Sequence, residues 1–304
     1  MAVNLAAIRD LLLPGLRDVT GEYKDYETQW SKIFQNAKSE MALERTASMR
    51  YLGLAQLKTE GGQTAFDNNA GERYIYNQEH NEIALGYAIT RKAIDDNLYK
   101  TQFRPSNLGL QKSFKQTKEI YGANILNTAT TFVNAVAGDG IALCATNHPV
   151  DTNTVANRPT TDLDLNESSL LSTMVAISQT FRDNANLRMS ALARKLVIPP
   201  PLEPVAIRLT KTELRPGTAM NDVNAIMFTA GGLKEGYMVN QYLTSNFAWF
   251  VLTDQEGLLY LERVPYETDM QVDFVTDNLL VKAYERYSFG YYDWRSIYGS
   301  FPTS

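Results

Sequence analysis

The two histidines are the first residues whose type could do acid–base or metal chemistry. His80 lies in a polar run, and His148 lies in a Thr-Asn-His-Pro segment. A general base or a metal ligand needs partners at a recognisable spacing, and neither histidine has them. We therefore expect both side chains to face solvent or to form local hydrogen bonds, without a catalytic role.

The cysteine and the glycine pairs do not provide a reactive centre either. Cys144, the single cysteine, has apolar neighbours, and a thiol in such a place is usually inert. Gly138 and Gly140 follow a predicted helix, whereas a phosphate-binding loop opens one. Gly231-Gly232 lacks the rest of such a loop. We expect no catalytic residue and no cofactor-binding residue at these positions.

The acidic segment 162–167 has the spacing at which a calcium-binding loop must be considered. Its sixth position is Glu167, where the loop needs glycine, and its twelfth position is Thr173, where it needs glutamate. The acids fit the first turn of a helix better. The chain also lacks the motifs of serine hydrolases and zinc proteases. We predict no metal site and no enzyme; an unfamiliar carboxylate site stays open as an alternative.

The composition is that of a globular protein made in a reducing cytoplasm. The 304 residues are 44% hydrophobic and 21% charged. One cysteine excludes an internal disulfide, and no apolar run has the roughly 20 residues of a membrane span. We find no signal peptide. The formal net charge of −5 argues against a dedicated nucleic-acid binder, although an acidic wall can enclose DNA without adhering to it.

Two N-terminal segments are too polar to form a core by themselves. Residues 1–48 combine helical pieces with a polar stretch, which predicts an arm that packs on the rest of the fold or on a neighbouring chain. Residues 59–73, rich in glycine and asparagine, should be exposed. They lead into an alternating pattern at 82–89 that is typical of a half-buried strand. This favours a projecting β-hairpin over an ordinary surface loop.

Aromatic residues are abundant, with 17 tyrosines and 12 phenylalanines, and they are favoured at protein interfaces. For any single aromatic residue, a place in the hydrophobic core is at least as good an interpretation as a place at an interface. We predict contacts between subunits at aromatic and charged residues of the arm and the hairpin, namely Tyr23, Tyr26, Trp30, Phe34, Phe66, Glu72, Arg73, Tyr74 and Tyr76.

The strongest helical pattern predicts one long helix over about residues 106–136, with Ser106 as its N-cap and Gly138 beyond its end. At about 1.5 Å per residue it would be about 40 Å long. Its apolar face consists of Leu110, Phe114, Tyr121, Ile125 and Phe132, and its other faces carry Lys112, Lys115, Lys118 and Glu119.

The rest of the chain mixes helix and strand. A helix is expected from about Asn166, with Leu170, Met174, Ile177 and Phe181 on one face. A short buried strand at 196–198 ends at three prolines. Further strands are expected at 247–253, 258–263, 272–275 and 279–287.

In this order, the segments resemble the major capsid proteins of the HK97 fold, and in particular the major head subunits of Mu-like phages. The resemblance is carried by residues 71–90 with 95–99, 138–143 with 147–149, 196–200, 242–250 and 273–295. It covers nearly the whole chain. No single segment is specific, because these are packing and turn patterns; their joint order carries the resemblance.

The resemblance implies an α+β, HK97-like capsid fold in four parts. They are an N-terminal arm at 1–48, an extended loop at 49–90, a peripheral domain with the spine helix at 91–145 and 262–292, and an axial domain at 146–261 and 293–304. It also implies hexamers and pentamers in an icosahedral shell that encloses double-stranded DNA. The expected partners are a portal protein and possible scaffold and decoration proteins. The protein is expected to be located in the virion, after synthesis in the bacterial host cytoplasm.

Three features of relatives are not expected here. The arm begins directly, which predicts no large cleaved propeptide. Lys58 is the nearest lysine on the loop, but no full cross-linking motif matches, so we expect non-covalent assembly. No segment resembles an inserted immunoglobulin-type domain. The alternatives are an encapsulin with protein cargo, a soluble enzyme with an unrecognised site, and a sheath or tail protein.

Overall fold

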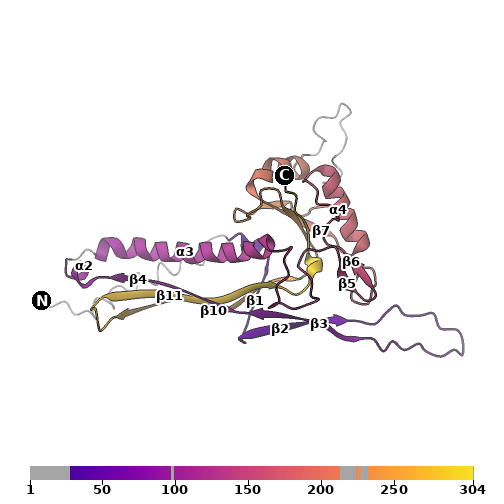
Figure 1. Ribbon diagram of the computed structural model, residues 1–304, viewed down its shortest axis with the longest axis horizontal. Coiled ribbons are helices and arrows are strands. Elements are labelled where there is room, and N and C mark those ends of the chain that lie inside the picture. The colour runs from indigo at the N-terminus through magenta and orange to yellow at the C-terminus, as the bar shows by residue number, and fades with distance from the viewer. Residues whose placement is uncertain (1–27, 97–98, 213–223, 225, 227–231, 304) are drawn as a thin grey trace. The chain divides into compact units, whose positions relative to one another are not determined.

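The computed structural model describes residues 28–96, 99–212, 224, 226 and 232–303 (Figure 1). The chain divides into two compact units. Unit 1 comprises Met1–Leu43, Glu79–Gly122 and Tyr260–Phe289, and unit 2 comprises Glu44–Gln78, Ala123–Leu259 and Gly290–Ser304. Both units combine helices with sheets, so the predicted α+β class is confirmed.

Unit 1 is built on a four-stranded sheet. Its strand order is β1 (Gln35–Lys38), β10 (Leu258–Val272), β11 (Leu279–Tyr291) and β4 (Asn81–Ile89). Strand β11 runs antiparallel to β4, from Leu279 opposite Ile89 to Tyr287 opposite Asn81. The short helix α2 (Arg91–Asp95) follows β4, and the long helix α3 (Tyr99–Asn127) then runs along the sheet (Figure 1).

Helix α3 buries its apolar face against this sheet. Leu110 and Phe114 form one cluster with Ala283, and the Phe114 ring meets the edge of Tyr266 at 5.2 Å. A second cluster surrounds Phe103 and contains Ile89, Ile94, Met270, Leu279 and Val281. The predicted inward positions Leu110 and Phe114 are confirmed. Tyr121 and Phe132, also predicted inward, are exposed.

The predicted bounds of the long helix were wrong at both ends. Helix α3 begins at Tyr99, so Ser106 lies inside it and is not an N-cap. Pro105 is accommodated within α3 at the cost of a helical hydrogen bond, and the burial of Phe103 before it offsets that cost. At the other end, the β-branched residues that follow Asn127 are poor helix formers, and residues 128–131 form a turn.

Two charged residues of α3, which the pattern placed outside its apolar face, are buried. Lys118 pairs with Glu285 at 2.7 Å and lies 4.8 Å from the ring centroid of Tyr287. Glu119 accepts hydrogen bonds from the backbone N–H groups of Gln29 and Trp30. Burial raises the pKa of Glu119, and these backbone bonds oppose that effect. Periodicity could not predict this burial, because it depends on partners distant in sequence.

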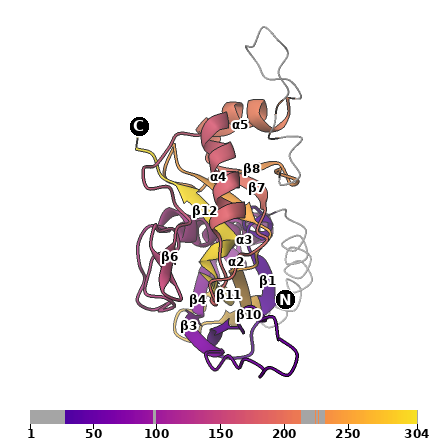
Figure 2. The same ribbon diagram turned by 90° about the vertical axis from the view of Figure 1, so that its right-hand side faces the viewer.

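Unit 2 has its own four-stranded sheet, in the order β12 (Ile297–Ser300), β9 (Trp249–Thr253), β7 (Ala193–Ile198) and β8 (Tyr237–Val239). Strand β7 runs antiparallel to β9 and parallel to β8. Helix α4 (Glu167–Thr180) packs against β7 (Figure 2). The other elements are α5 (Glu203–Thr210), the short helices η2 (Pro200–Leu202) and η3 (Trp294–Ser296), and the strand pair β5 (His148–Val150) and β6 (Asn153–Val155).

The sequence predictions for α4 and β7 are confirmed. Asn166 caps α4 by accepting the backbone N–H of Ser169, which forms a capping box. The four predicted apolar residues of this helix, Leu170, Met174, Ile177 and Phe181, are all buried. Strand β7 is central in its sheet and ends before Pro199, because a proline cannot donate to the ladder.

The alternating segment 82–89, which was expected to be the second strand of the hairpin, lies in β4 and is not part of the hairpin. Strand β4 pairs with β11 in unit 1. The hairpin consists of β2 (Leu43–Arg50) and β3 (Gly71–Glu79), which pair with each other and are joined by residues 51–70. Alternation identifies a half-buried strand but cannot select its partner.

Two details of the C-terminal region also differ from the prediction. The strand expected at 258–263 is longer than predicted, because β10 continues to Val272. Most of the strand expected at 272–275 is instead the turn after β10, in which Asp277 N–H donates to the Asp273 carbonyl. Helix α5 was not predicted, because its few turns give too short a pattern to recognise.

Candidate functional site

The nine predicted contact residues lie in different environments. Tyr23 and Tyr26 are outside the described residues. Trp30, Phe34 and Tyr76 are buried inside the chain. Phe66 and Glu72 are exposed, and Arg73 and Tyr74 are half-buried.

The described part of the arm is anchored by aromatic packing within unit 1. The short helix η1 (Trp30–Lys32) places the Trp30 ring 4.2 Å from that of Tyr260 and 5.6 Å from that of Phe289. The Phe34 ring meets the same Phe289 ring at 5.0 Å. These two arm residues therefore serve the packing of their own subunit.

Tyr76 fixes strand β3 to the segment that follows α3. The backbone N–H of Asn77 donates to the Val136 carbonyl, and that of Gly138 donates to the Ile75 carbonyl. Gly138 has φ +66°, and a side chain there would collide with the Tyr76 ring. Burial raises the pKa of Tyr76. The buried position of the Tyr76 ring therefore requires a glycine at residue 138.

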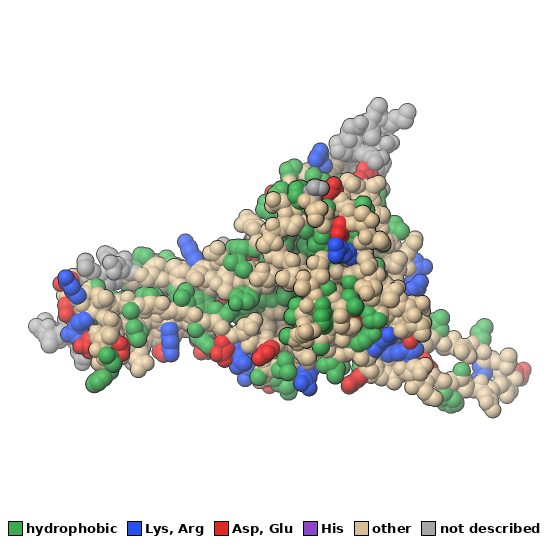
Figure 3. All heavy atoms as spheres, viewed as in Figure 1, with side chains coloured by type: hydrophobic (Ala, Val, Ile, Leu, Met, Phe, Trp, Pro, Cys, Tyr) green, Lys and Arg blue, Asp and Glu red, His purple; other side chains and the backbone are tan. Residues whose placement is uncertain are grey.

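The segment between the hairpin strands exposes large apolar side chains. Figure 3 shows hydrophobic side chains on the hairpin that projects at the right. A folded monomer rarely leaves such a set in water unless a partner covers it. The exposed apolar residues of this hairpin tip are Tyr51, Leu52, Leu54, Leu57 and Phe66.

A second exposed apolar pair occupies the turn between β10 and β11 in unit 1. Phe274 is 97% exposed and Val275 is 87% exposed. Asp273 organises this turn by accepting from Val275 N–H and from the Thr276 hydroxyl, contacts that lower its pKa. The turn therefore has a defined conformation and presents apolar side chains.

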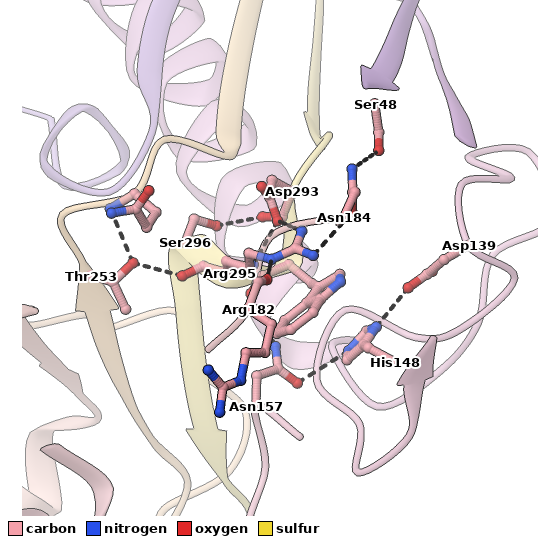
Figure 4. A network of polar contacts seen from close by, with 12 residues as sticks. Ser48, Asp139, His148, Asn157, Arg182, Asn184, Thr253, Asp293, Arg295 and Ser296 are labelled. Carbon is pink, nitrogen blue, oxygen red and sulfur yellow. Dashed lines mark hydrogen bonds and ion pairs between the residues drawn. The ribbon is translucent and has the colours of Figure 1, made fainter. Parts of the chain in front are cut away.

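A buried polar network lies at the base of the hairpin (Figure 4). Its centre is Arg295 of η3, which donates to the Asp293 carboxylate, to the Arg182 carbonyl and to Asn184 Oδ1. The Arg295 guanidinium also lies 4.4 Å from the ring centroid of Trp294. A guanidinium with this many partners is held in one geometry.

His148 continues this network on the other side of Trp294. Its ring stacks on the indole at 4.3 Å, almost parallel. Its Nδ1 is 2.7 Å from Asp139 Oδ2, and its Nε2 is 3.2 Å from Asn157 Oδ1. Both ring nitrogens are thus within hydrogen-bond distance of a side-chain oxygen.

Asn157 is oriented by the surrounding backbone. Its Nδ2 donates to the carbonyls of Leu143, Trp294 and Ile297, and its Oδ1 accepts from Ala145 N–H. The amide therefore joins the segment after α3 to the C-terminal strand β12. These contacts support structure and contain no nucleophile beside a base.

Of the two alternatives expected for the histidines, solvent exposure was wrong, because both are buried. Local hydrogen bonds are found for His148, whose partners Asp139 and Asn157 are each nine residues away, but not for His80. His80 contacts Ser39 Oγ at 2.8 Å and Ser288 Oγ at 2.9 Å, and both serines are remote in sequence. The polar run around His80 and the loop around His148 gave no indication of this. The partners of His80 could have been found only by a search for residues far along the chain.

Cys144 is buried as expected, and burial raises the pKa of its thiol. In the described ranges, no group of three or more His, Cys, Asp or Glu residues could hold a metal ion. Nor does any helix there have the length and apolar character to cross a membrane.

Solved structures define the fold class. The chain is similar to the mature capsid protein of bacteriophage PhiM1, with TM-score 0.56 and 9% identity over 92% of this chain and 88% of that one. It is similar to the procapsid protein of bacteriophage JBD30, with TM-score 0.52 and 11% identity over 99% and 77%. A virus-like particle from Pyrococcus furiosus gives TM-score 0.53 and 8% identity over 94% and 97%. The fold is that of HK97-type capsid proteins.

The family follows from the sequence itself. The model of the family described as phage capsid protein matches residues 81–300, which is more than half of the chain, and the chain belongs to this family. It is therefore a structural capsid protein of a bacteriophage virion. A search among curated proteins found no match.

Proposed function

We propose that the chain is the major capsid protein of a tailed bacteriophage of the Mu-like type. It would assemble into hexamers and pentamers of an icosahedral shell that encloses double-stranded DNA. The observation that carries this proposal is the exposed apolar hairpin tip, joined to the capsid family. A tip with five large apolar side chains in water needs a partner surface, and in a closed shell the adjacent subunits supply it.

We propose a separate role for each of the four expected parts of the chain. Residues 1–48 act as the arm and 49–90 as the extended loop. Residues 91–145 with 262–292 form the peripheral domain, and 146–261 with 293–304 form the axial domain. Within the loop, Phe66, Glu72, Arg73 and Tyr74 are the proposed contacts with neighbouring subunits. Of the arm, we keep Tyr23 and Tyr26 as proposed contacts; Trp30, Phe34 and Tyr76 would contribute mainly by orienting these segments.

The proposed assembly is non-covalent and non-enzymatic. Lys58 lies on the hairpin tip, and we propose no cross-link through it. A portal protein, and a scaffold or decoration proteins, are proposed partners. The packaged DNA would be contacted without sequence preference, as the net charge of −5 disfavours tight binding to the wall. Synthesis would take place in the bacterial host cytoplasm.

The second candidate is an encapsulin-type shell with protein cargo. The similarity to the Pyrococcus furiosus particle concerns the fold, which phage heads and such shells share. The match to the phage capsid family favours the phage role.

Electron microscopy of particles purified from producing cells tests the proposal, together with nuclease treatment and analysis of the contents. Closed icosahedral shells with nuclease-protected double-stranded DNA are expected. Shells that hold only protein would favour the encapsulin role. Helical tubes, or a monodisperse monomer with enzymatic turnover, would contradict both.

A further inference from the structure

Asn184 contacts the ends of β2 and β3 from which residues 51–70 extend, which we call the base of the hairpin tip. We propose that Asn184 is a positioning residue that sets the direction in which the hairpin tip, residues 51–70, projects from the rest of unit 2, and thereby the diameter of the shell. The part concerning the shell rests on the proposed function, because it takes the hairpin as a contact between subunits. The part concerning the hairpin stands on the geometry of unit 2 alone.

Asn184 contacts both strands of the hairpin. Its Nδ2 donates to Ser48 Oγ at 2.7 Å and to the Met49 carbonyl at 2.8 Å, at the end of β2. Its own carbonyl accepts from Arg73 Nη1 of β3 at 2.8 Å. Arg73 Nη2 also donates to the Asp151 carbonyl at 3.3 Å. Both strands are thus tied to the rest of unit 2 at the ends from which residues 51–70 extend.

The orientation of the Asn184 amide is determined by its partners. On one side lies Arg295, which has only donors, and its Nη2 is 3.0 Å from Oδ1. On the other side lies the Met49 carbonyl, which can only accept. A flipped amide would oppose donor to donor and acceptor to acceptor. The amide can therefore bridge β2 to Arg295 in one orientation only.

A tight turn holds Asn184 in place. Asp183 Oδ1 accepts from Ala185 N–H at 2.9 Å and from Leu187 N–H at 2.7 Å. The Asp183 N–H donates to the Leu187 carbonyl, and Asn186 has φ +63°. Behind the turn, Arg295 is 5% exposed and is paired with Asp293. Asn184 thus connects this turn and the paired Arg295 to the ends of both hairpin strands.

The hairpin depends on this support because two strands are marginally stable without it. Residues 51–70 beyond the strands are almost entirely exposed. The position of the tip therefore follows from the angle at the base, and a small change of that angle displaces a distant tip by a large distance. Subunits whose tips reach a different place on their neighbours would close shells of a different diameter.

Two variants of the full chain test the proposal. Asn184→Ala removes both donors and the acceptor. Asn184→Asp keeps the acceptor for Arg295 and loses both donors to β2. In each, amide hydrogen exchange over residues 43–50 and 71–79 should be about tenfold faster than in the wild type. Asn153→Ala, an exposed asparagine on β6 of the same unit, is the matched control and should leave exchange there unchanged.

Electron microscopy of particles from the same variants provides the second measurement. We expect Asn184→Asp to give a broader range of diameters, or open shells, while exchange over α4 and β7 stays at the wild-type level. Unchanged exchange in β2 and β3 would overturn the proposal. So would accelerated exchange with particles of wild-type diameter and yield. A wild-type chain that forms no shells would instead refute the proposed function and leave the exchange result to decide the role of Asn184 in the hairpin.

Discussion

Phe114 and Phe66 are the same residue type in opposite environments. Phe114, on α3, is 1% exposed and packs against the sheet of unit 1. Phe66, in the hairpin tip, is 85% exposed and accompanied by other apolar side chains in water. Burial of a phenylalanine stabilises the folded state by about 1.5–3 kcal/mol. Phe114 gives this stabilisation to the subunit, whereas Phe66 can give it only to a complex.

The contrast separates two kinds of substitution. Changes in the two cores should reduce the free energy of unfolding of the subunit. Changes in the hairpin tip should leave the subunit folded and affect only what it assembles into. The predictions below test this separation, from the largest expected effect on stability to the smallest.

Phe114→Asp should abolish folding. The carboxylate would lie in an apolar cluster without a partner, at a cost above about 4 kcal/mol, a large part of the total stability of a typical domain. We expect insoluble protein on expression, measured by the soluble fraction and by circular dichroism. Ile120→Asp, at an exposed position of α3, is the control and should fold. Soluble, folded Phe114→Asp would show that the buried face of α3 has another role.

Glu285→Leu should destabilise unit 1 by about 3–5 kcal/mol, because it removes the carboxylate that pairs with the buried Lys118. The double variant Lys118→Met with Glu285→Leu removes both charges and should recover most of that loss. Denaturant unfolding of the three proteins measures it. A double variant as unstable as the single one would contradict the assignment of the cost to the unpaired charge.

His148→Phe should cost about 1–3 kcal/mol. The new ring can still stack on Trp294, but the Asp139 carboxylate and the Asn157 oxygen each lose a contact in a buried site. The shift of the denaturant midpoint measures the effect. The matched variant Asp139→Asn keeps a polar group beside His148 and should cost less. Equal stability of His148→Phe and the wild type would mean that stacking alone holds this site.

Deletion of residues 61–71 should change the free energy of unfolding by less than about 1 kcal/mol, because most of the segment is exposed. The folded subunits should fail to close stable shells. Sedimentation separates subunits from particles. Replacement of residues 61–70 by a glycine–serine segment of equal length removes the side chains but keeps the length of the tip, so it separates these two causes of failed assembly. Normal particles from the deletion variant would refute the assembly role of the tip.

Phe66→Ser should have the smallest effect on the subunit, within about 0.5 kcal/mol, as for most surface substitutions. It should still lower the yield of particles, measured by light scattering during assembly. The yield of particles from Phe274→Ser, in the exposed turn of unit 1, shows for comparison the effect of removing a second exposed aromatic ring. An unchanged yield for Phe66→Ser would place the contact elsewhere on the tip.

Much of the local structure could be predicted from the sequence. The capped helix α4, strand β7 and the inward face of α3 around Phe114 follow from periodicity, capping and proline positions. These signals lie within a few residues of one another. The beginning of α3 could not be predicted, because a proline that normally excludes a helix interior is tolerated where Phe103 is buried.

The parts that depend on distant partners were missed. Lys118 and Glu119 lie beside one another on α3, yet one is buried by Glu285 and the other by the backbone of η1. Strand β4 could be recognised as a strand, but its pairing with β11 could not. The Asn184 contacts join residues 136 positions apart in the chain, and asparagine in a polar segment carries no pattern that indicates such a role.

The sequence by itself determined the class of this protein. The order of its segments, and the family resemblance that this order carries, indicated an HK97-type capsid protein, because those segments are recognised from local patterns. The tertiary structure alone decided where the hairpin begins, which strands form it and what holds its base. Those outcomes depend on hydrogen bonds and ion pairs between distant segments, whose energies exist only when the chain is folded.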